Sequence, residues 1–215
     1  MVRKITLLIA LSILILTQVH AGWGGGNGRG WRGGQEQVVD SLTSEEAQHL
    51  LLLREEEKVA RDVYDLLYQQ WGLFIFSNIA SAEQRHMDSV LAQLQRYGLV
   101  DPALQPGVFG NQELQALYDS LILQGTSSEM DALLTGALIE EVDMQDLHEM
   151  LEATENSGLT RLYQKLLCGS RNHLRAFVRQ IESRGMVYQA QVMDQAAVDQ
   201  IVDSPMERGC GRRYR

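Results

Sequence analysis

The chain has 215 residues, 45% of them hydrophobic, which is enough for one domain with a single sizeable core. It carries 28 Asp and Glu against 19 Lys and Arg, a formal net charge of −9. This acidic balance argues against nucleic acid as a partner, because phosphate contacts need a basic face, and favours cations. Only three prolines and 7% aromatic residues, with Leu, Ala, Glu and Gln recurring, predict an all-α protein.

Residues 1–21 have the pattern of a secretory signal peptide. Arg3 and Lys4 precede an apolar run over 5–17, and Val19-His20-Ala21 is a small-x-small cleavage site. The run is shorter than the ~20 residues of a membrane span, so an uncleaved anchor is the weaker alternative. We therefore expect cleavage after Ala21 and a protein that is secreted or periplasmic.

Residues 22–40 form a Gly-rich leader that cannot bury enough apolar surface to order itself. Trp23 and Trp31 could associate with a cell-surface partner, although the composition favours a plain flexible linker. The expected domain then spans residues 41–184, and residues 185–215 form a partly disordered C-terminal extension with a weak amphipathic segment over 192–202.

Four long amphipathic helices account for most of the domain, and their connections allow antiparallel packing into a four-helix bundle. Capping residues and apolar periodicity place them over residues 44–71, 77–97, 128–153 and 158–183. An extra short helix, over residues 112–123, lies between the second and third of these.

Polar side chains interrupt the apolar stripe on each long helix. In chain order they are Glu57, then Glu83 with His86, then Glu140 with Asp143, and finally His173. Residues three apart lie on the same face of a helix, so the Glu-x-x-His pair of the second helix can bind one ion. A buried carboxylate costs several kcal/mol unless it is protonated, paired or bound to a metal.

Oxygen and imidazole ligands without thiolate suit iron or manganese, and facing helices of a bundle can hold two such ions bridged by carboxylates. The alternatives are histidines that are hydrogen-bonded core residues and glutamates that pair with Arg61, Arg85 or Arg171. Such a coincidence on four helices favours the metal site. On the third helix Glu140 faces inward better than Glu141, although a small rotation would exchange them.

The strings Glu57-x-x-Ala60-Arg61-x-x-Tyr64 and Glu83-x-x-His86 resemble the rubrerythrin and ferritin-like superfamily. Three further strings, together with these two, resemble a secreted bacterial and archaeal branch of it, catalogued as domain of unknown function 2202, over about residues 45–182. They are Phe76-Ser77-Asn78-Ile79-Ala80, Gly136-Ala137-Leu138-Ile139-Glu140-Glu141 and Gly169-Ser170-Arg171-Asn172-His173-Leu174-Arg175-Ala176-Phe177.

The resemblance implies a ferritin-like bundle and assigns metal ligands to it. Glu57 would be the terminal or bridging ligand of the first helix, Glu83 and His86 the pair of the second, and Glu140 the carboxylate of the third. His173 matches the His of the second Glu-x-x-His motif, but Ser170 stands where that motif places Glu. Either Asp143 substitutes, or the second metal is weak, or only one ion binds.

Three functions remain after this reading. The first is a di-iron oxidoreductase that oxidises Fe(II) or reduces dioxygen or peroxide, in which Tyr64 either acts in catalysis or is an ordinary core tyrosine. The second is a protein that sequesters metal without turnover, and the third is a non-metal helical interaction module. A homodimer remains open.

The chain has two cysteines, Cys168 and Cys210, and the sequence leaves a disulfide and two free thiols equally open. It has no Cys-x-x-Cys pair, so the electron donor that rubrerythrins carry is absent.

Overall fold

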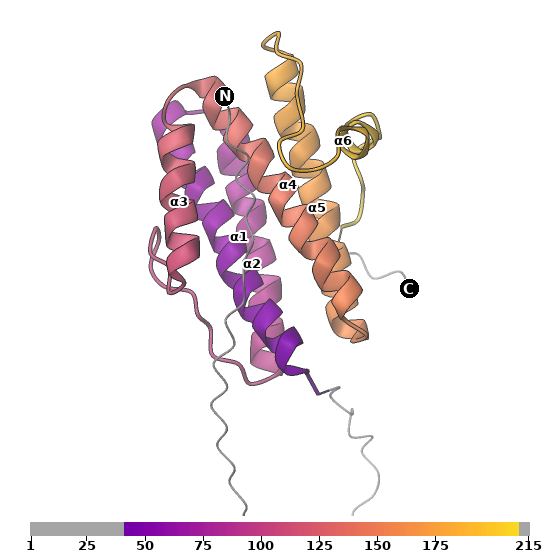
Figure 1. Cartoon of the computed structure of the whole chain (residues 1–215). Coiled ribbons are helices and arrows are strands. Elements are labelled where there is room, and N and C mark those ends of the chain that lie inside the picture. The colour runs from indigo at the N-terminus through magenta and orange to yellow at the C-terminus, as the bar shows by residue number, and fades with distance from the viewer. Residues whose placement is uncertain (1–40, 211–215) are drawn as a thin grey trace, which may run out of the picture. The chain divides into compact units, whose positions relative to one another are not determined.

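The computed structural model describes residues 41–210, so the predicted signal peptide, the leader and the last five residues lie outside the described part. Within it the chain is all-helical, as predicted, with six helices (Figure 1). These are α1 (Ser44–Trp71), α2 (Phe74–Arg96), α3 (Gln112–Gly125), α4 (Glu129–Ala153), α5 (Ser157–Glu182) and α6 (Gln195–Val202). No helix between residues 41 and 210 is both long and apolar enough to cross a bilayer.

The long helices form two hairpins that pack together as a helical bundle. Two residues join α1 to α2 and three join α4 to α5, so the helices of each pair run antiparallel. The hairpins meet where α1 packs on α4 and α2 on α5, while α3 packs across α1 and α4 and α6 packs on α5 (Figure 1). Four long helices therefore enclose one shared interior.

Aromatic and aliphatic side chains fill that interior. On α1 the stripe predicted from periodicity is buried, and Leu50, Tyr64 and Leu67 have no exposed surface. The Tyr64 ring lies 5.4 Å from the Phe177 ring and 6.2 Å from the Phe76 ring, so three helices share one aromatic cluster. Rings at these separations contribute stability beyond their buried area.

The start of α2 differs from the prediction. The sequence placed its start at residue 77, whereas the helix begins at Phe74 after Leu73 in an extended conformation. Gly72 ends α1 with a positive φ of 68°, which reverses the chain at once and lets α2 start without a side-chain cap. The earlier start adds residues upstream and leaves the inward positions of α2 unchanged.

Besides the inward Glu57, α1 carries a polar cluster on a face that the sequence did not indicate to be buried. Lys58 is 1% exposed, donates to Asp62 over 2.7 Å and lies 3.9 Å from the centroid of the Phe109 ring. Asp62 and Glu55 also accept the backbone N–H groups of Gly107 and Gly110. These contacts anchor the segment between α2 and α3 to α1, which explains why the charged face is covered.

The C-terminal extension is anchored to α4 by one carboxylate. Glu141 is fully buried and accepts hydrogen bonds from the Tyr188 hydroxyl, at 2.6 Å, and from the backbone N–H groups of Gln191, Val192 and Met193. It therefore faces the extension, and Glu140 is the inward residue of the pair.

Further along, the extension is attached to α5. A disulfide joins Cys168 to Cys210, with Cα atoms 5.5 Å apart, which decides the alternative that the sequence left open. Glu207 bonds Arg171 through two contacts of 2.6 Å and Arg175 at 3.1 Å. Of the predicted C-terminal extension, residues 211–215 lie outside the described part.

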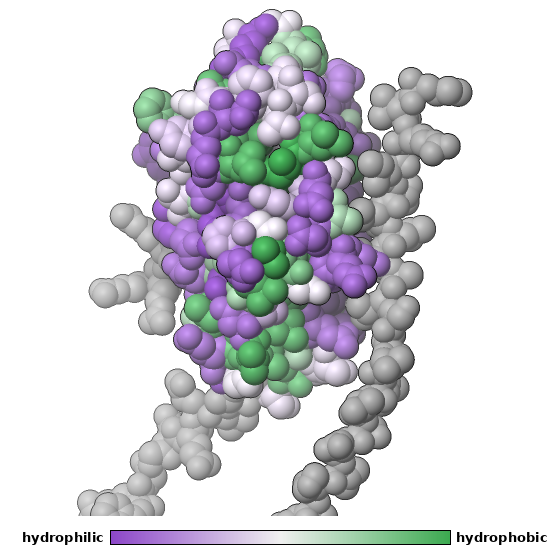
Figure 2. Space-filling model, turned by 90° about the vertical axis from the view of Figure 1, so that its left-hand side faces the viewer, coloured by the Kyte–Doolittle hydropathy of each residue, from purple (hydrophilic) through white to green (hydrophobic). Residues whose placement is uncertain are grey.

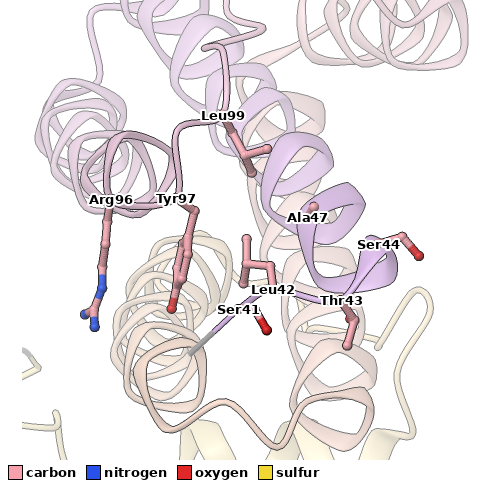
Figure 3. A pocket seen from close by; sticks show the side chains of 8 residues that line it. All are labelled: Ser41, Leu42, Thr43, Ser44, Ala47, Arg96, Tyr97 and Leu99. Atoms are coloured by element: carbon pink, nitrogen blue, oxygen red, sulfur yellow. The ribbon is translucent and has the colours of Figure 1, made fainter. Parts of the chain in front are cut away.

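The outer surface is mixed in character. On the face seen in Figure 2, hydrophobic areas are separated by hydrophilic ones. Leu123 and Val100 are among the exposed apolar residues of the described part of the chain. A surface pocket lies where α1 begins, between Leu42, Ala47 and Tyr97 (Figure 3). Glu57 lies 13 residues beyond Ser44 on α1, about 20 Å along the axis, so this pocket is separate from the inward carboxylates.

Candidate metal centre

The inward polar residues converge midway along the bundle. Glu57 comes from α1, Glu83 and His86 from α2, Glu140 from α4 and His173 from α5. The three glutamates are each 2% exposed, and the side chains of His86 and His173 are 9% and 11% exposed. The structure therefore brings together residues that are up to 116 positions apart in the chain.

One group of possible ligands consists of Glu57, Glu83 and His86, whose ligand atoms lie within 4.8 Å of one another. The Nδ1 atom of His86 is 2.8 Å from Oε2 of Glu83 and 3.2 Å from Oε2 of Glu57. Both partners therefore present oxygen to the same imidazole nitrogen. Such a set of two carboxylates and one histidine could hold a metal ion.

The second group consists of Glu83, Glu140 and His173 and repeats this arrangement on α4 and α5. The Nδ1 atom of His173 is 2.8 Å from Oε1 of Glu83 and 3.3 Å from Oε2 of Glu140. The imidazole rings of His86 and His173 stack with centroids 5.6 Å apart. The two histidines thus lie on opposite sides of one carboxylate.

Glu83 is the residue that both groups share. Its Oε2 atom faces His86 and its Oε1 atom faces His173, so each oxygen belongs to a different group. A carboxylate with one oxygen in each of two ligand groups has the arrangement of a bridging ligand. Each group could therefore hold a metal ion, and Glu83 would contribute one oxygen to each.

Two buried atoms of the cluster lack a hydrogen bond among the described residues. They are Oε1 of Glu57 and Nδ1 of His173. The contacts of this nitrogen with Glu83 and Glu140, at 2.8 and 3.3 Å, are ionic contacts. Leaving a buried polar atom unbonded costs about 1–3 kcal/mol. A cation in each ligand group would satisfy these atoms, so the residues present fit a metal.

The electrostatics of the cluster depend on burial and on the two histidines. Burial raises the pKa of Glu57 well above its ordinary value, and that of Glu140 is also raised. For Glu83, burial is outweighed by His173 and His86, which hold its pKa well below the usual range. Burial would lower the pKa of His173, but Glu83 and Glu140 raise it to about 10. The metal-free cluster therefore carries protons where ions would bind.

Asp143 is placed at the edge of the centre. The Ser170 hydroxyl donates to its Oδ2 atom, and burial with the nearby Glu140 raises the pKa of Asp143 to about 7. Asp143 belongs to neither ligand group. The position that the sequence resemblance reserves for a second bridging Glu is thus occupied by a Ser–Asp hydrogen bond.

Tyr64 lies on the α4 side of the centre. Its hydroxyl donates to Oε1 of Glu140 over 2.6 Å and lies 3.2 Å from the carbonyl oxygen of Gly136. Burial, reinforced by Glu140 and Glu83, raises the pKa of Tyr64 well above its ordinary value. The hydroxyl is therefore neutral, and it orients the carboxylate of one ligand group.

The arginines that could have neutralised these glutamates bind elsewhere. Arg61 pairs with Asp62, Arg85 donates to the backbone carbonyl of Ser81, and Arg171 pairs with Glu207. Among the described residues, these three arginines therefore do not form a Glu–Arg network with the inward glutamates.

Two helical glycines are part of the site although sequence analysis gave them no role. A Cβ atom at Gly169 would lie 2.5 Å from Nε2 of His86, and one at Gly136 would lie 2.4 Å from the Phe177 ring. Glycine within a helix is less stable than alanine by about 1 kcal/mol, so a glycine there usually has a packing reason. Gly136 and Gly169 in the middle of predicted helices were therefore the sequence signal that another side chain packs closely against the backbone.

The fold and the site define an all-helical bundle with a buried carboxylate and histidine cluster that could hold metal. Residues 46–205 match the family described as "Uncharacterized protein domain (DUF2202)", and the chain belongs to that family.

A relative and a solved structure carry the same name. The "Uncharacterized protein MJ0754" of Methanocaldococcus jannaschii is 43% identical over 173 residues, which cover 80% of this chain and 94% of that protein. The crystal structure titled "hypothetical protein MJ0754" is similar with a TM-score of 0.77 and 41% identity, and covers 80% of this chain and all of that one. The match spans nearly the full length of the relative.

Proposed function

We propose that this protein is a ferritin-like metalloprotein whose bundle binds two iron ions, with manganese as the alternative metal. The observation that carries the proposal is the position of Glu83, which presents one oxygen to each ligand group. Glu57 with His86 would complete one site, and Glu140 with His173 the other. Hard oxygen and imidazole donors without thiolate suit these metals.

We further propose an oxidoreductase activity. Bound iron would supply the redox chemistry by which Fe(II) is oxidised and dioxygen or peroxide is reduced. The chain itself would position the metal ligands and shield the centre from water. The bundle keeps the centre in a largely dry interior, and Tyr64 fixes the orientation of Glu140. Asp143 and Ser170 lie beside the centre and could hold or release a proton there.

Metal content tests this proposal most directly. The wild-type protein, prepared with iron, manganese and zinc all available, should contain about two ions per chain, most of them iron. Glu83→Gln should lose both ions because both groups share that residue, whereas Glu140→Gln should lose one first. Glu149→Gln, an exposed position on the same helix as Glu140, is the control and should bind as the wild type does. An empty wild-type protein would overturn the proposal.

Metal sequestration without turnover and a non-metal interaction module are the two other candidate functions. The supporting observation is that the Glu83 carboxylate contacts His86 and His173, and these ion pairs could be purely structural. If iron binds but is not oxidised by dioxygen or peroxide, sequestration without turnover explains the site. If no metal binds, the cluster is a charge network and the protein is a helical interaction module. A circular dichroism melt of each variant separates loss of metal from loss of fold.

The compartment is part of the same proposal. We propose that the chain is exported after cleavage behind Ala21, because disulfides persist mainly in oxidising compartments and Cys168 is paired. The N-terminus of the protein recovered from its native source, read by mass spectrometry, should be Gly22. An intact Met1 in that protein would contradict export by this signal.

A further inference from the structure

We propose that Cys168 and Cys210 are a redox-active pair that supplies two electrons to the metal centre, with peroxide as the final acceptor. This inference rests on the proposed function, because it names the electron donor for the same site. It starts from the disulfide, because Cys168 is followed on α5 by Gly169, the glycine that packs against His86.

Cys168 is close to a ligand of the centre. The next residue, Gly169, packs against the Nε2 edge of His86, where an added Cβ would lie only 2.5 Å away. Neighbouring Cα atoms are about 3.8 Å apart, so the sulfur of Cys168 lies within about 11 Å of that imidazole. The route from sulfur to ligand runs through the covalent bonds that join Cys168 to Gly169 and then through the contact of Gly169 with His86. Electron transfer weakens steeply with distance, and this distance is short.

Cys210 lies over the same turns of α5. Its sulfur is 3.5 Å from Nδ2 of Asn172, and the next residue is His173. Glu207 is tied to Arg171 and Arg175 by contacts of 2.6 and 3.1 Å. These ion pairs would keep Cys210 near Cys168 when the bond opens, so that the disulfide can form again. Both cysteines are partly exposed, which lets an external dithiol reach them.

The oxidative half of the cycle balances with hydrogen peroxide as the only other reactant. Two thiols lose two protons and two electrons and join in one S–S bond, while hydrogen peroxide gains both, its O–O bond breaks and two water molecules form. An external dithiol returns the pair to its reduced state by thiol–disulfide exchange. The two electrons that the thiols supply equal the number that two metal ions would carry if the oxidation state of each changed by one. The chain holds no other cysteine, so this pair is its only thiol donor.

The test uses the wild-type protein in two redox states, because the two cysteines make thiol counts unambiguous. Dithiol protein is loaded anaerobically with two Fe(II) and given two equivalents of hydrogen peroxide. The irons supply electrons for the first equivalent, and the thiols must supply those for the second. Thiols are then counted in denaturant, and the disulfide is identified by the mass of the linked peptides. Dithiol protein loaded with zinc is the matched control, because zinc fills the ligands without redox change.

We expect both thiols to be lost in the iron-loaded protein at least about tenfold faster than with zinc, with an intramolecular disulfide as the product. Equal rates with iron and zinc would overturn the inference, since peroxide would then attack the thiols directly. Persistence of the thiols after the peroxide is consumed would also overturn it. Iron oxidation in the disulfide-intact protein reports on the proposed function separately. If that oxidation fails, the site lacks the activity itself, whatever the thiols do.

Discussion

At the scale of single residues, the Tyr64 hydroxyl supports a metal ligand through one short bond. It donates to Glu140 over 2.6 Å inside the core, where Tyr64 has no exposed surface and Glu140 is 2% exposed. The Tyr163 hydroxyl, by contrast, is buried without a hydrogen-bond partner among the described residues. The two tyrosines therefore form a natural pair for measuring what the bond contributes.

Tyr64→Phe should lower the free energy of unfolding of the metal-free protein by about 1–3 kcal/mol, because Glu140 loses a donor in a buried environment. Tyr163→Phe should leave it within about 0.5 kcal/mol of the wild type or raise it. Urea denaturation monitored by circular dichroism measures both. Equal losses in the two variants would mean that the Tyr64 bond contributes nothing specific.

Gly169 controls the position of His86 because no side chain fits between the helix and the ring. Gly169→Ala should displace the imidazole and weaken metal binding by about 10- to 100-fold, the usual effect of disturbing the support of a ligand. Gly110→Ala is the control, since its Cβ would make an ordinary contact of 3.6 Å with Glu55. Titration calorimetry with Mn(II) compares them, and unchanged affinity in Gly169→Ala would show that the ring has room to move.

At the scale of elements, α4 carries two adjacent carboxylates with different partners. Glu140 faces the centre between α1 and α5, and Glu141 accepts the backbone N–H groups of the extension. Successive residues of a helix point about 100° apart, so one helix can serve both the interior and its outer cover. The extension is therefore attached to the element that carries a metal ligand.

Glu141→Ala should release the segment around residues 188–193, because a buried phenol and three backbone N–H groups lose their acceptor. We expect a loss of about 2–4 kcal/mol in unfolding free energy and faster hydrogen exchange confined to that segment and α6. Glu149→Ala, an exposed position on α4, should change neither. Unchanged exchange at Gln191 in Glu141→Ala would contradict the anchoring role.

At the scale of the whole molecule, metal binding competes with protons. The pKa of His173, about 10, lies above the usual value of about 6.5, so its proton stabilises the metal-free fold below pH ~6.5. This stabilisation is lost as the pH rises through about 10. A bound metal must displace the same proton, so affinity should rise with pH.

Metal binding near pH 7 should therefore release protons to the buffer. Calorimetric titrations of Mn(II) in two buffers with different ionisation enthalpies would count them, and the apparent affinity should increase from pH 6 to pH 8. Glu83→Gln should lose the heat of binding and the proton release together. Binding whose heat is the same in both buffers would mean that the histidines are already neutral.

Much of the architecture could be predicted because its signals are local. Apolar periodicity placed α1, α3, α4 and α5 within a few residues of their observed bounds, and it placed Glu57 and His173 in buried stripes. The start of α2 was wrong because Gly72 makes a turn so tight that no capping side chain is needed. The burial of Lys58 was missed because a loop covers a face that looks solvent-exposed in one helix alone.

By itself the sequence determined which side chains share a face of each helix, since that depends only on 3.6 residues per turn. It thereby determined the all-helical class and the Glu83-x-x-His86 pair. Tertiary structure alone decided that Glu83 lies between two histidines, that Asp143 bonds Ser170 and that Cys168 meets Cys210. These relations join different helices or a helix to the tail, and helix rotation and packing set them, which no local pattern encodes.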